Sequence, residues 1–385
     1  MLRGMLLVGL MLSTGSICLA QLLEDSLFCQ QARQGLNHTY NADFDAAQVI
    51  FEALADSHPE HPAPHFLLAT NRWWQTFICV TPHFHRYIDQ QVQMALAKNE
   101  RFLADSPWPQ EYTLFQYLGH ALHARLATHR FEWFTAANRG RKVIPYLDDC
   151  IAYADSNVEF CFAAGIYHYY AATFAQTNAL VRPFMAFFPD GNVTKGLSEL
   201  ERAVAEPNFT QPEALYYLTY IYLEPAARDT VRAQQIAHQL WRAYPQNPWF
   251  ACEYARVKVH TGFHADALPV LDALIERYEA QPGAAEQLIS SLSSAYTTKL
   301  AMRAYHYRGL ARLDGEQAYE QAKLDFEVSL RYAARCGIEE DHYVAAGWFY
   351  LGRCHEGLQQ PARAQEAYRK AEEADAFGEF ADRIE

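Results

Sequence analysis

The sequence is poor in the residues that build turns. Glycine occurs 18 times and proline 17 times in 385 residues. These low counts argue against a disordered chain and against an all-β fold, which needs many tight turns. Half of the residues (50%) are apolar, so the chain can bury a large core. Because the chain exceeds the length at which one compact core usually splits into domains, an architecture of units that contact only their neighbours is favoured.

Basic residues are also few. The chain has 32 Lys and Arg against 45 Asp and Glu, which gives a formal net charge of −13. Nucleic acids and anionic membranes bind basic surfaces, so this balance disfavours both as partners. Basic partners and neutral ligands remain compatible with it.

Motifs of catalysis are missing from the sequence. No glycine-rich phosphate loop precedes a predicted helix, and no Gly-x-Ser-x-Gly nucleophile turn occurs. Paired acids such as Asp148-Asp149 lie beside predicted helix ends, where a solvated surface explains them. The sequence therefore predicts a protein that is not an enzyme and has no cofactor.

The eight cysteines do not form a Cys-x-x-Cys motif. Cys150 and Cys161 lie on consecutive predicted helices, and Cys336 and Cys354 flank a predicted loop. Neither pair has the spacing of a metal site. Disulfides are possible in an exported protein, but buried free thiols that act as small apolar residues are the favoured interpretation.

The first 20 residues are typical of a secretory signal peptide. Arg3 supplies a positive start, Met5 to Leu12 form a short apolar run, and a region of small residues ends at Ala20. Two alternatives are an uncleaved anchor, for which the apolar run is short, and lipidation of Cys18. We expect a mature chain of residues 21–385 that is exported, periplasmic or associated with the cell envelope, and that has no transmembrane helix.

A spacing of small residues recurs along the chain. Gly352 and Ala364 are 12 residues apart near the C-terminus, and Gly35 and Ala47 show the same offset near the N-terminus. Large residues such as Tyr368 follow at helical spacing. Two antiparallel helices approach closely only where each presents a small side chain, and large side chains then fill the space beside the contact.

This pattern resembles the tetratricopeptide repeat (TPR), a helical hairpin of about 34 residues. More narrowly, the chain resembles exported bacterial TPR proteins of unassigned role. The resemblance implies an all-α, right-handed solenoid of about eight or nine helical hairpins over residues 21–385. The repeats are clearest at 26–59, 213–245, 245–278 and 345–374, and an aromatic insert is expected at 175–192.

The resemblance also implies a protein or peptide partner bound in a concave groove. The first helix of each hairpin lines that groove, where aromatic side chains give large contact areas and arginines bind carboxylates or carbonyls. The alternative for each residue is packing between repeats. The candidates are Trp73, Trp74, His120, His123, Tyr169, Tyr170, Tyr216, Tyr220, Trp249, Arg256, Phe349 and Arg353.

Histidines supply a second hypothesis. Nine of the 16 lie at or before residue 129, with close spacings at His58, His61 and His65 and at His120 and His123. The alternative function is therefore a small-ligand or metal-binding protein that uses this N-terminal third. No His-Glu-x-x-His motif occurs, and the first group is interrupted by prolines, so a bound metal is not expected.

Overall fold

The computed structural model describes residues 22–102, 104, 107–177, 190–281, 296–336, 342–375 and 380. Within these ranges the chain is helical and contains no strand, which confirms the all-α prediction. The expected signal peptide lies outside the described residues, as does most of the expected insert. None of the described helices is both long and apolar enough to cross a membrane.

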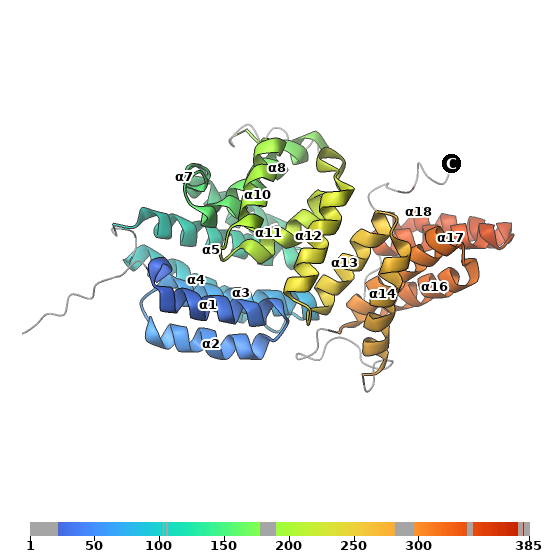
Figure 1. The fold of residues 1–385 in the computed structure, drawn as a ribbon, viewed down its shortest axis with the longest axis horizontal. Helices are drawn as coiled ribbons and strands as arrows, with labels where there is room; N and C mark the ends of the chain where they lie inside the picture. The colour runs from blue at the N-terminus through green and yellow to red at the C-terminus, as the bar shows by residue number, and fades with distance from the viewer. Residues whose placement is uncertain are drawn as a thin grey trace, which may run out of the picture.

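The helices follow one another as hairpins (Figure 1). In the first half they are α1 (Ser26–Tyr40), α2 (Phe44–Ser57), α3 (Pro62–Cys79), α4 (His85–Phe102), α5 (Pro109–His129), α6 (Trp133–Gly140), α7 (Ile144–Ala154) and α8 (Cys161–Thr177). In the second half they are α10 (Val193–Ala205), α11 (Gln211–Ile221), α12 (Thr230–Ala243), α13 (Pro248–His260), α14 (His264–Glu279), α15 (Thr298–Leu310), α16 (Tyr319–Arg335), α17 (His342–Gly357) and α18 (Pro361–Ala374).

Four hairpins share one turn. Two residues after the first helix ends, a residue adopts a positive φ, and the next residue donates its N–H to the carbonyl five positions earlier, as in a Schellman motif. The left-handed residues are Ala42, Phe131, Gly262 and Gln359, with φ of 62°, 59°, 83° and 58°. The turns join α1 to α2, α5 to α6, α13 to α14 and α17 to α18. These four hairpins are therefore built alike, and three of them coincide with predicted repeats.

Two of the spaced glycines pack against aromatic rings of the partner helix. A Cβ added at Gly35 would lie 2.3 Å from Cε1 of Phe51, and one added at Gly352 would lie 2.4 Å from Cε1 of Tyr368. In both hairpins an aromatic ring 16 residues further on occupies the space that a glycine leaves. The sequence analysis expected Gly35 and Gly352 to meet the small residues Ala47 and Ala364, whereas the atoms nearest to both glycines belong to aromatic rings.

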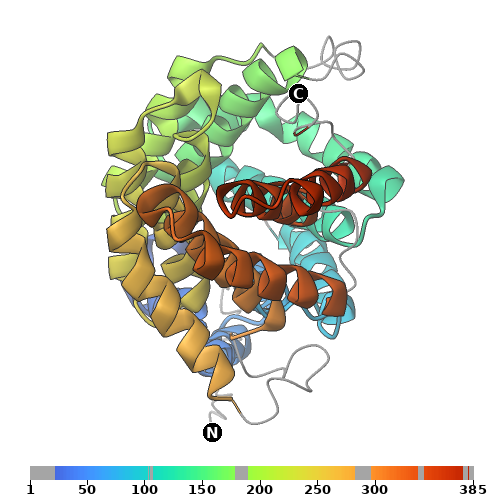
Figure 2. The same cartoon turned by 90° about the vertical axis from the view of Figure 1, so that its right-hand side faces the viewer.

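The N-terminal hairpins curl back onto the middle of the chain. Asn247 Nδ2 donates to the carbonyl of Tyr40 at 2.8 Å, and Trp74 Nε1 donates to Glu213 Oε1 at 2.8 Å. The guanidinium of Arg33 lies 5.1 Å from the ring centroid of Phe209. In Figures 1 and 2 the helices accordingly follow a curved path that brings α1 beside α11 and α13. The face inside this curve is covered by other helices of the same chain.

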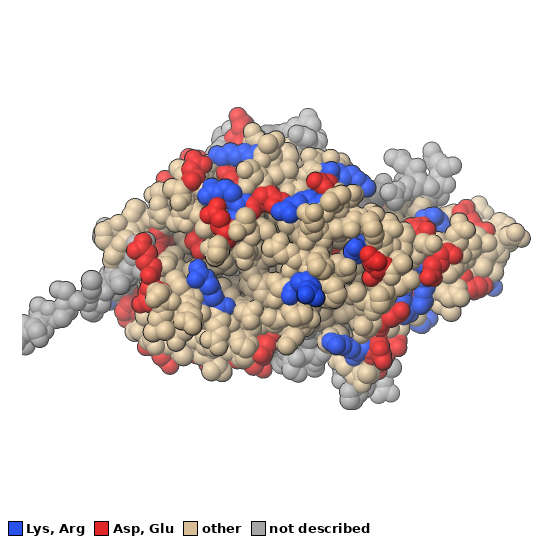
Figure 3. All heavy atoms as spheres, in the orientation of Figure 1, with Lys and Arg blue, Asp and Glu red and all other residues tan. Residues whose placement is uncertain are grey.

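The charges on the outer surface are mixed. On the face shown in Figure 3, acidic and basic side chains alternate and do not gather into a region of one sign. Several of them form ion pairs between helices, such as Arg308 with Asp272 and with Asp325.

Candidate functional site

The twelve groove candidates lie mostly inside the protein. None of them belongs to the exposed class, because the curled chain covers the face on which they lie. The partly exposed members are His120, Tyr170, Tyr220 and Arg353. The buried members are Trp73, Trp74, His123, Tyr169, Tyr216, Trp249, Arg256 and Phe349.

The structure brings six of the candidates together, and we call them the aromatic–arginine cluster: Trp73, Trp74, Tyr216, Tyr220, Trp249 and Arg256. The ring centroids of Trp74 and Tyr216 are 5.6 Å apart, and those of Tyr216 and Tyr220 are 5.3 Å apart. Phe77 extends the cluster to Trp249, with centroids 5.0 Å apart. These edge-to-face contacts join α3, α11 and α13.

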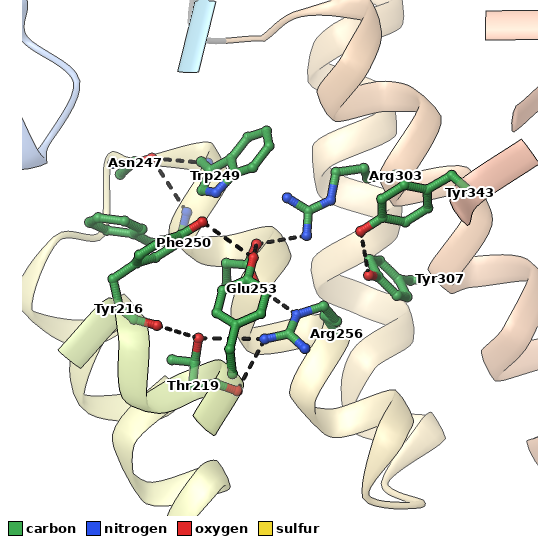
Figure 4. Close-up of polar contacts among 11 residues, drawn as sticks. Tyr216, Thr219, Asn247, Trp249, Phe250, Glu253, Arg256, Arg303, Tyr307 and Tyr343 are labelled. Carbon is green, nitrogen blue, oxygen red and sulfur yellow. Dashed lines mark hydrogen bonds and ion pairs between the residues drawn. The ribbon is translucent and has the colours of Figure 1, made fainter. Parts of the chain in front are cut away.

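Glu253 lies at the centre of the polar part of this cluster (Figure 4). Its Oε2 accepts a hydrogen bond from Arg256 Nε at 2.6 Å, and its Oε1 accepts one from Arg303 Nη2 at 2.7 Å. Tyr220 donates to the same Oε1 at 2.5 Å. Burial raises the pKa of this carboxyl, but the two arginines outweigh burial and lower the pKa to about 2. Glu253 is therefore ionised at any physiological pH.

Aromatic faces hold the two arginines in place. The guanidinium of Arg256 lies 4.0 Å from the ring centroid of Tyr220, and that of Arg303 lies 4.3 Å from the centroid of Trp249. Beside Arg303, the hydroxyls of Tyr307 and Tyr343 are 2.7 Å apart. The network joins α11, α13, α15 and α17, so its evident role is to clamp successive hairpins together (Figure 4).

The sequence analysis placed Arg256 in a groove, where it would bind a partner's carboxylate or carbonyl, but its guanidinium binds Glu253 of the same chain. The parts played by Glu253 and Arg303 were not predicted. A signal for Glu253 was available, because Glu253 and Arg256 are three residues apart and therefore share a face of α13. No such spacing predicts the contact between Glu253 and Arg303, because these two residues are 50 positions apart in the sequence.

The other six candidates lie elsewhere. Tyr169 donates to Glu224 Oε2 at 2.7 Å, with Tyr170 beside it, and Phe349 packs on Tyr368. Arg353 forms an ion pair of 3.1 Å with Asp314, so it does not join Arg256 in binding a common carboxylate.

The two helical histidines face α4 and α7. His123 Nε2 lies 3.5 Å from Asp89 Oδ1, and His120 stacks on Tyr146 with ring centroids 6.2 Å apart. Burial is the main cause that lowers the pKa of His123 to about 4, so its ring is neutral near pH 7. Across the described residues, no group of three or more His, Cys, Asp and Glu side chains is arranged to hold a metal ion.

The cysteines of the described chain are free thiols. Cys150 and Cys161 are both buried, and Cys161 Sγ donates to the carbonyl of Ala154 at 3.5 Å instead of bonding to Cys150. Cys336 and Cys354 are also unbonded to each other. Burial raises the pKa of Cys150 and Cys354, which makes both thiols poor nucleophiles.

A cavity of about 260 Å³ lies between α1, α3, α5, α8 and α11. Its lining is mostly aliphatic and aromatic, with the first helices of successive hairpins supplying the walls. Its charged members are Arg125, Glu159 and Glu213. Arg125 Nη1 donates to Glu213 Oε2 at 3.1 Å, and the backbone N–H of Phe209 donates to Glu159 Oε2 at 3.0 Å.

Exposed aromatic side chains gather where α5 turns into α6. Phe131, Trp133 and Phe134 are 78%, 62% and 90% exposed, and no residue of α6 is buried. Asp89 on α4 fixes this turn, since it accepts hydrogen bonds from Arg130 at 2.8 Å and from Arg139 at 3.4 Å. We call the segment 130–142 the α6 corner.

Comparison with known proteins assigns no role to the cavity or to the α6 corner. No family model matches the chain, and a search of curated proteins finds no match for it either.

Proposed function

We propose that this protein is an exported helical scaffold of the tetratricopeptide type that binds a protein partner and performs no catalysis. The shared turns and the glycine-to-aromatic packing support the repeat assignment. The contact surface that we propose is the α6 corner, because the residues expected in an inner groove are covered by the chain itself.

The observation that carries this proposal is the exposure of three neighbouring aromatics. Large apolar side chains that gather on a surface mark interaction sites, and buried aromatics supply most of the energy of protein interfaces. Phe131 occupies the left-handed position of the turn shared by the four hairpins, at φ 59°. The turn keeps its phenyl ring in water, 78% exposed.

The charges at the α6 corner indicate the chemistry of the partner. Arg130 and Arg139 are occupied by Asp89. Arg141 and Lys142 are exposed, and no described residue forms an ion pair with either of them. Glu132 is also exposed, between Phe131 and Trp133, so the unpaired positive charge lies only at the 141–142 end of the corner. A partner segment with apolar anchors and an acidic residue facing that end would complement this surface.

Site-specific photocrosslinking tests the proposal. A photoreactive amino acid at Phe134 should capture one partner reproducibly in cells, whereas the same group at Leu324, which is 56% exposed on α16, should not. With the identified partner purified, Trp133→Ser should weaken binding about 30-fold, the effect of losing an interface hot spot. Leu324→Ser is the matched control and should leave the affinity unchanged.

Two results would contradict this function. Capture of the same mixture of proteins at positions 134 and 324 would mean that the corner has no specific partner. Binding of the purified protein to vesicles of anionic lipid through Trp133, with no protein captured, would make the corner a membrane contact.

A further inference from the structure

The cavity between α1 and α11 is large enough for an organic molecule. An apolar cavity of about 150 Å³ holds benzene in a protein interior, so 260 Å³ corresponds to roughly ten carbon atoms. The walls come from five helices of five hairpins, and rings such as Phe66, Phe115 and Phe162 provide broad apolar faces.

One side of the cavity carries donors that the protein does not use. Arg125 lies deep in the structure, stacked on Trp73 with 4.7 Å between its guanidinium carbon and the ring centroid. Yet 26% of its side-chain surface is uncovered, and Arg125 is one of the cavity-lining residues. Both of its hydrogen bonds to Glu213 come from Nη1, so Nε and Nη2 have no acceptor among the described residues.

Two further polar groups on the lining lack partners. Thr70 Oγ1 and Trp73 Nε1 are buried and make no hydrogen bond, although both residues line the cavity. Neither atom reaches the surface of the cavity, so among these groups only the N–H groups of Arg125 are available to a ligand.

The charges of the lining select against a charged ligand. Glu213 already neutralises Arg125, so an anionic head group would meet Glu213 and Glu159 without a spare cation. A cationic head group would compete with Arg125 for the faces of Trp73 and Tyr217. Burial raises the pKa of Glu159 to about 7, so this carboxyl is itself only partly charged. A neutral head group that accepts a hydrogen bond avoids both conflicts.

We propose that this cavity binds a neutral apolar small molecule of roughly ten carbon atoms that carries one hydrogen-bond acceptor, held by the free N–H groups of Arg125. The hydrophobic walls supply most of the affinity, and Arg125 sets the orientation. The site is separate from the α6 corner, so a failure of one proposal leaves the other intact.

Three ligands with the same chain and different head groups test the inference. The full-length protein is titrated with 1-decanol, decanoate and decylamine at pH 7, each measured by the change in tryptophan fluorescence, since Trp73 lines the cavity, and by calorimetry. We expect 1-decanol to bind with one-to-one stoichiometry and at least tenfold more tightly than either charged ligand.

Variants locate the site. Ala121→Phe fills the cavity and should abolish decanol binding, while Ala124→Phe, on the same helix but outside the lining, should retain it. Arg125→Lys keeps the positive charge beside Glu213 but loses the forked donors, and should weaken decanol binding about fivefold, the worth of one hydrogen bond. Circular dichroism and urea unfolding verify that each variant is folded.

Several outcomes would overturn the inference. If the wild-type protein shows no saturable decanol binding by either method, the cavity is not a ligand site. Tighter binding of decanoate or decylamine would exclude a neutral ligand. Unchanged binding by a folded Ala121→Phe variant would place the ligand elsewhere.

Discussion

Replacing Glu253 with glutamine tests whether the buried ion network holds the hairpins together. The amide keeps the size of the carboxyl group but removes its charge. Arg256 and Arg303, both buried, would then be two cations without a counter-ion. Breaking a buried pair in this way costs about 3 to 5 kcal/mol of unfolding free energy. We therefore expect Glu253→Gln to be less stable than the wild type by about that amount at pH 7.

The same network also predicts how the free energy of unfolding depends on pH. The pKa of Glu253 is about 2 in the folded protein, against an ordinary value of 4.5. Because the folded-state pKa is the lower one, the stabilisation is complete above pH 4.5 and is lost as the pH falls toward 2. The full difference corresponds to about 3 kcal/mol, of which about 2 kcal/mol should be gone by pH 3.

Urea unfolding followed by circular dichroism between pH 7 and pH 3 measures both effects. Below pH 4.5 the wild type should lose stability more steeply than Glu253→Gln, which has no carboxyl to protonate at this position. Glu366→Gln is the control, because Glu366 is in a surface ion pair with Arg369 and its loss should not be measurable. Parallel pH profiles, or equal stability of Glu253→Gln and wild type at pH 7, would refute the assigned role.

Two further predictions concern backbone and burial. Gly262 has φ 83°, and no atom lies within 4 Å of an added Cβ. Gly262→Ala should therefore lower the free energy of unfolding by about 1 to 2 kcal/mol through backbone strain alone. Gln359→Gly, at the equivalent turn, should raise the free energy of unfolding by about 1 kcal/mol. Urea unfolding checks both, and a stabilising Gly262→Ala would contradict the shared turn. Glu159 has a pKa raised to about 7, so the folded state binds a proton that the unfolded state releases. Stability should therefore fall by at most about 3 kcal/mol as pH rises from 4.5 to 7, and Glu159→Gln should remove this slope.

The features that could be predicted from the sequence are those within one hairpin. The pairing of Gly35 with the ring of Phe51 depends on residues 16 apart, and helical geometry fixes their meeting. The same holds for Gly352 and Tyr368. The left-handed turn residues were less visible, because only Gly262 of the four is a glycine and the other three adopt a conformation that their side chains do not favour.

The closure of the chain could not be predicted in this way. Tyr40 and Asn247 meet across 207 residues, and Trp74 and Glu213 meet across 139. Such contacts depend on small rotations that accumulate from one hairpin to the next, and no local pattern encodes their sum. The prediction of an inner groove assumed that the curve stays open. Because these contacts close the curve, most of the aromatic residues predicted to line the groove lie in the core.

The proposed partner surface and the proposed ligand cavity share one helix. Arg125 lines the cavity near the end of α5, and Arg130, five residues later, begins the α6 corner and is fixed by Asp89. The two sites are thus separated by little more than one helical turn. Binding linkage is reciprocal, so any factor by which the ligand changes the affinity for the partner must equal the factor by which the partner changes the affinity for the ligand.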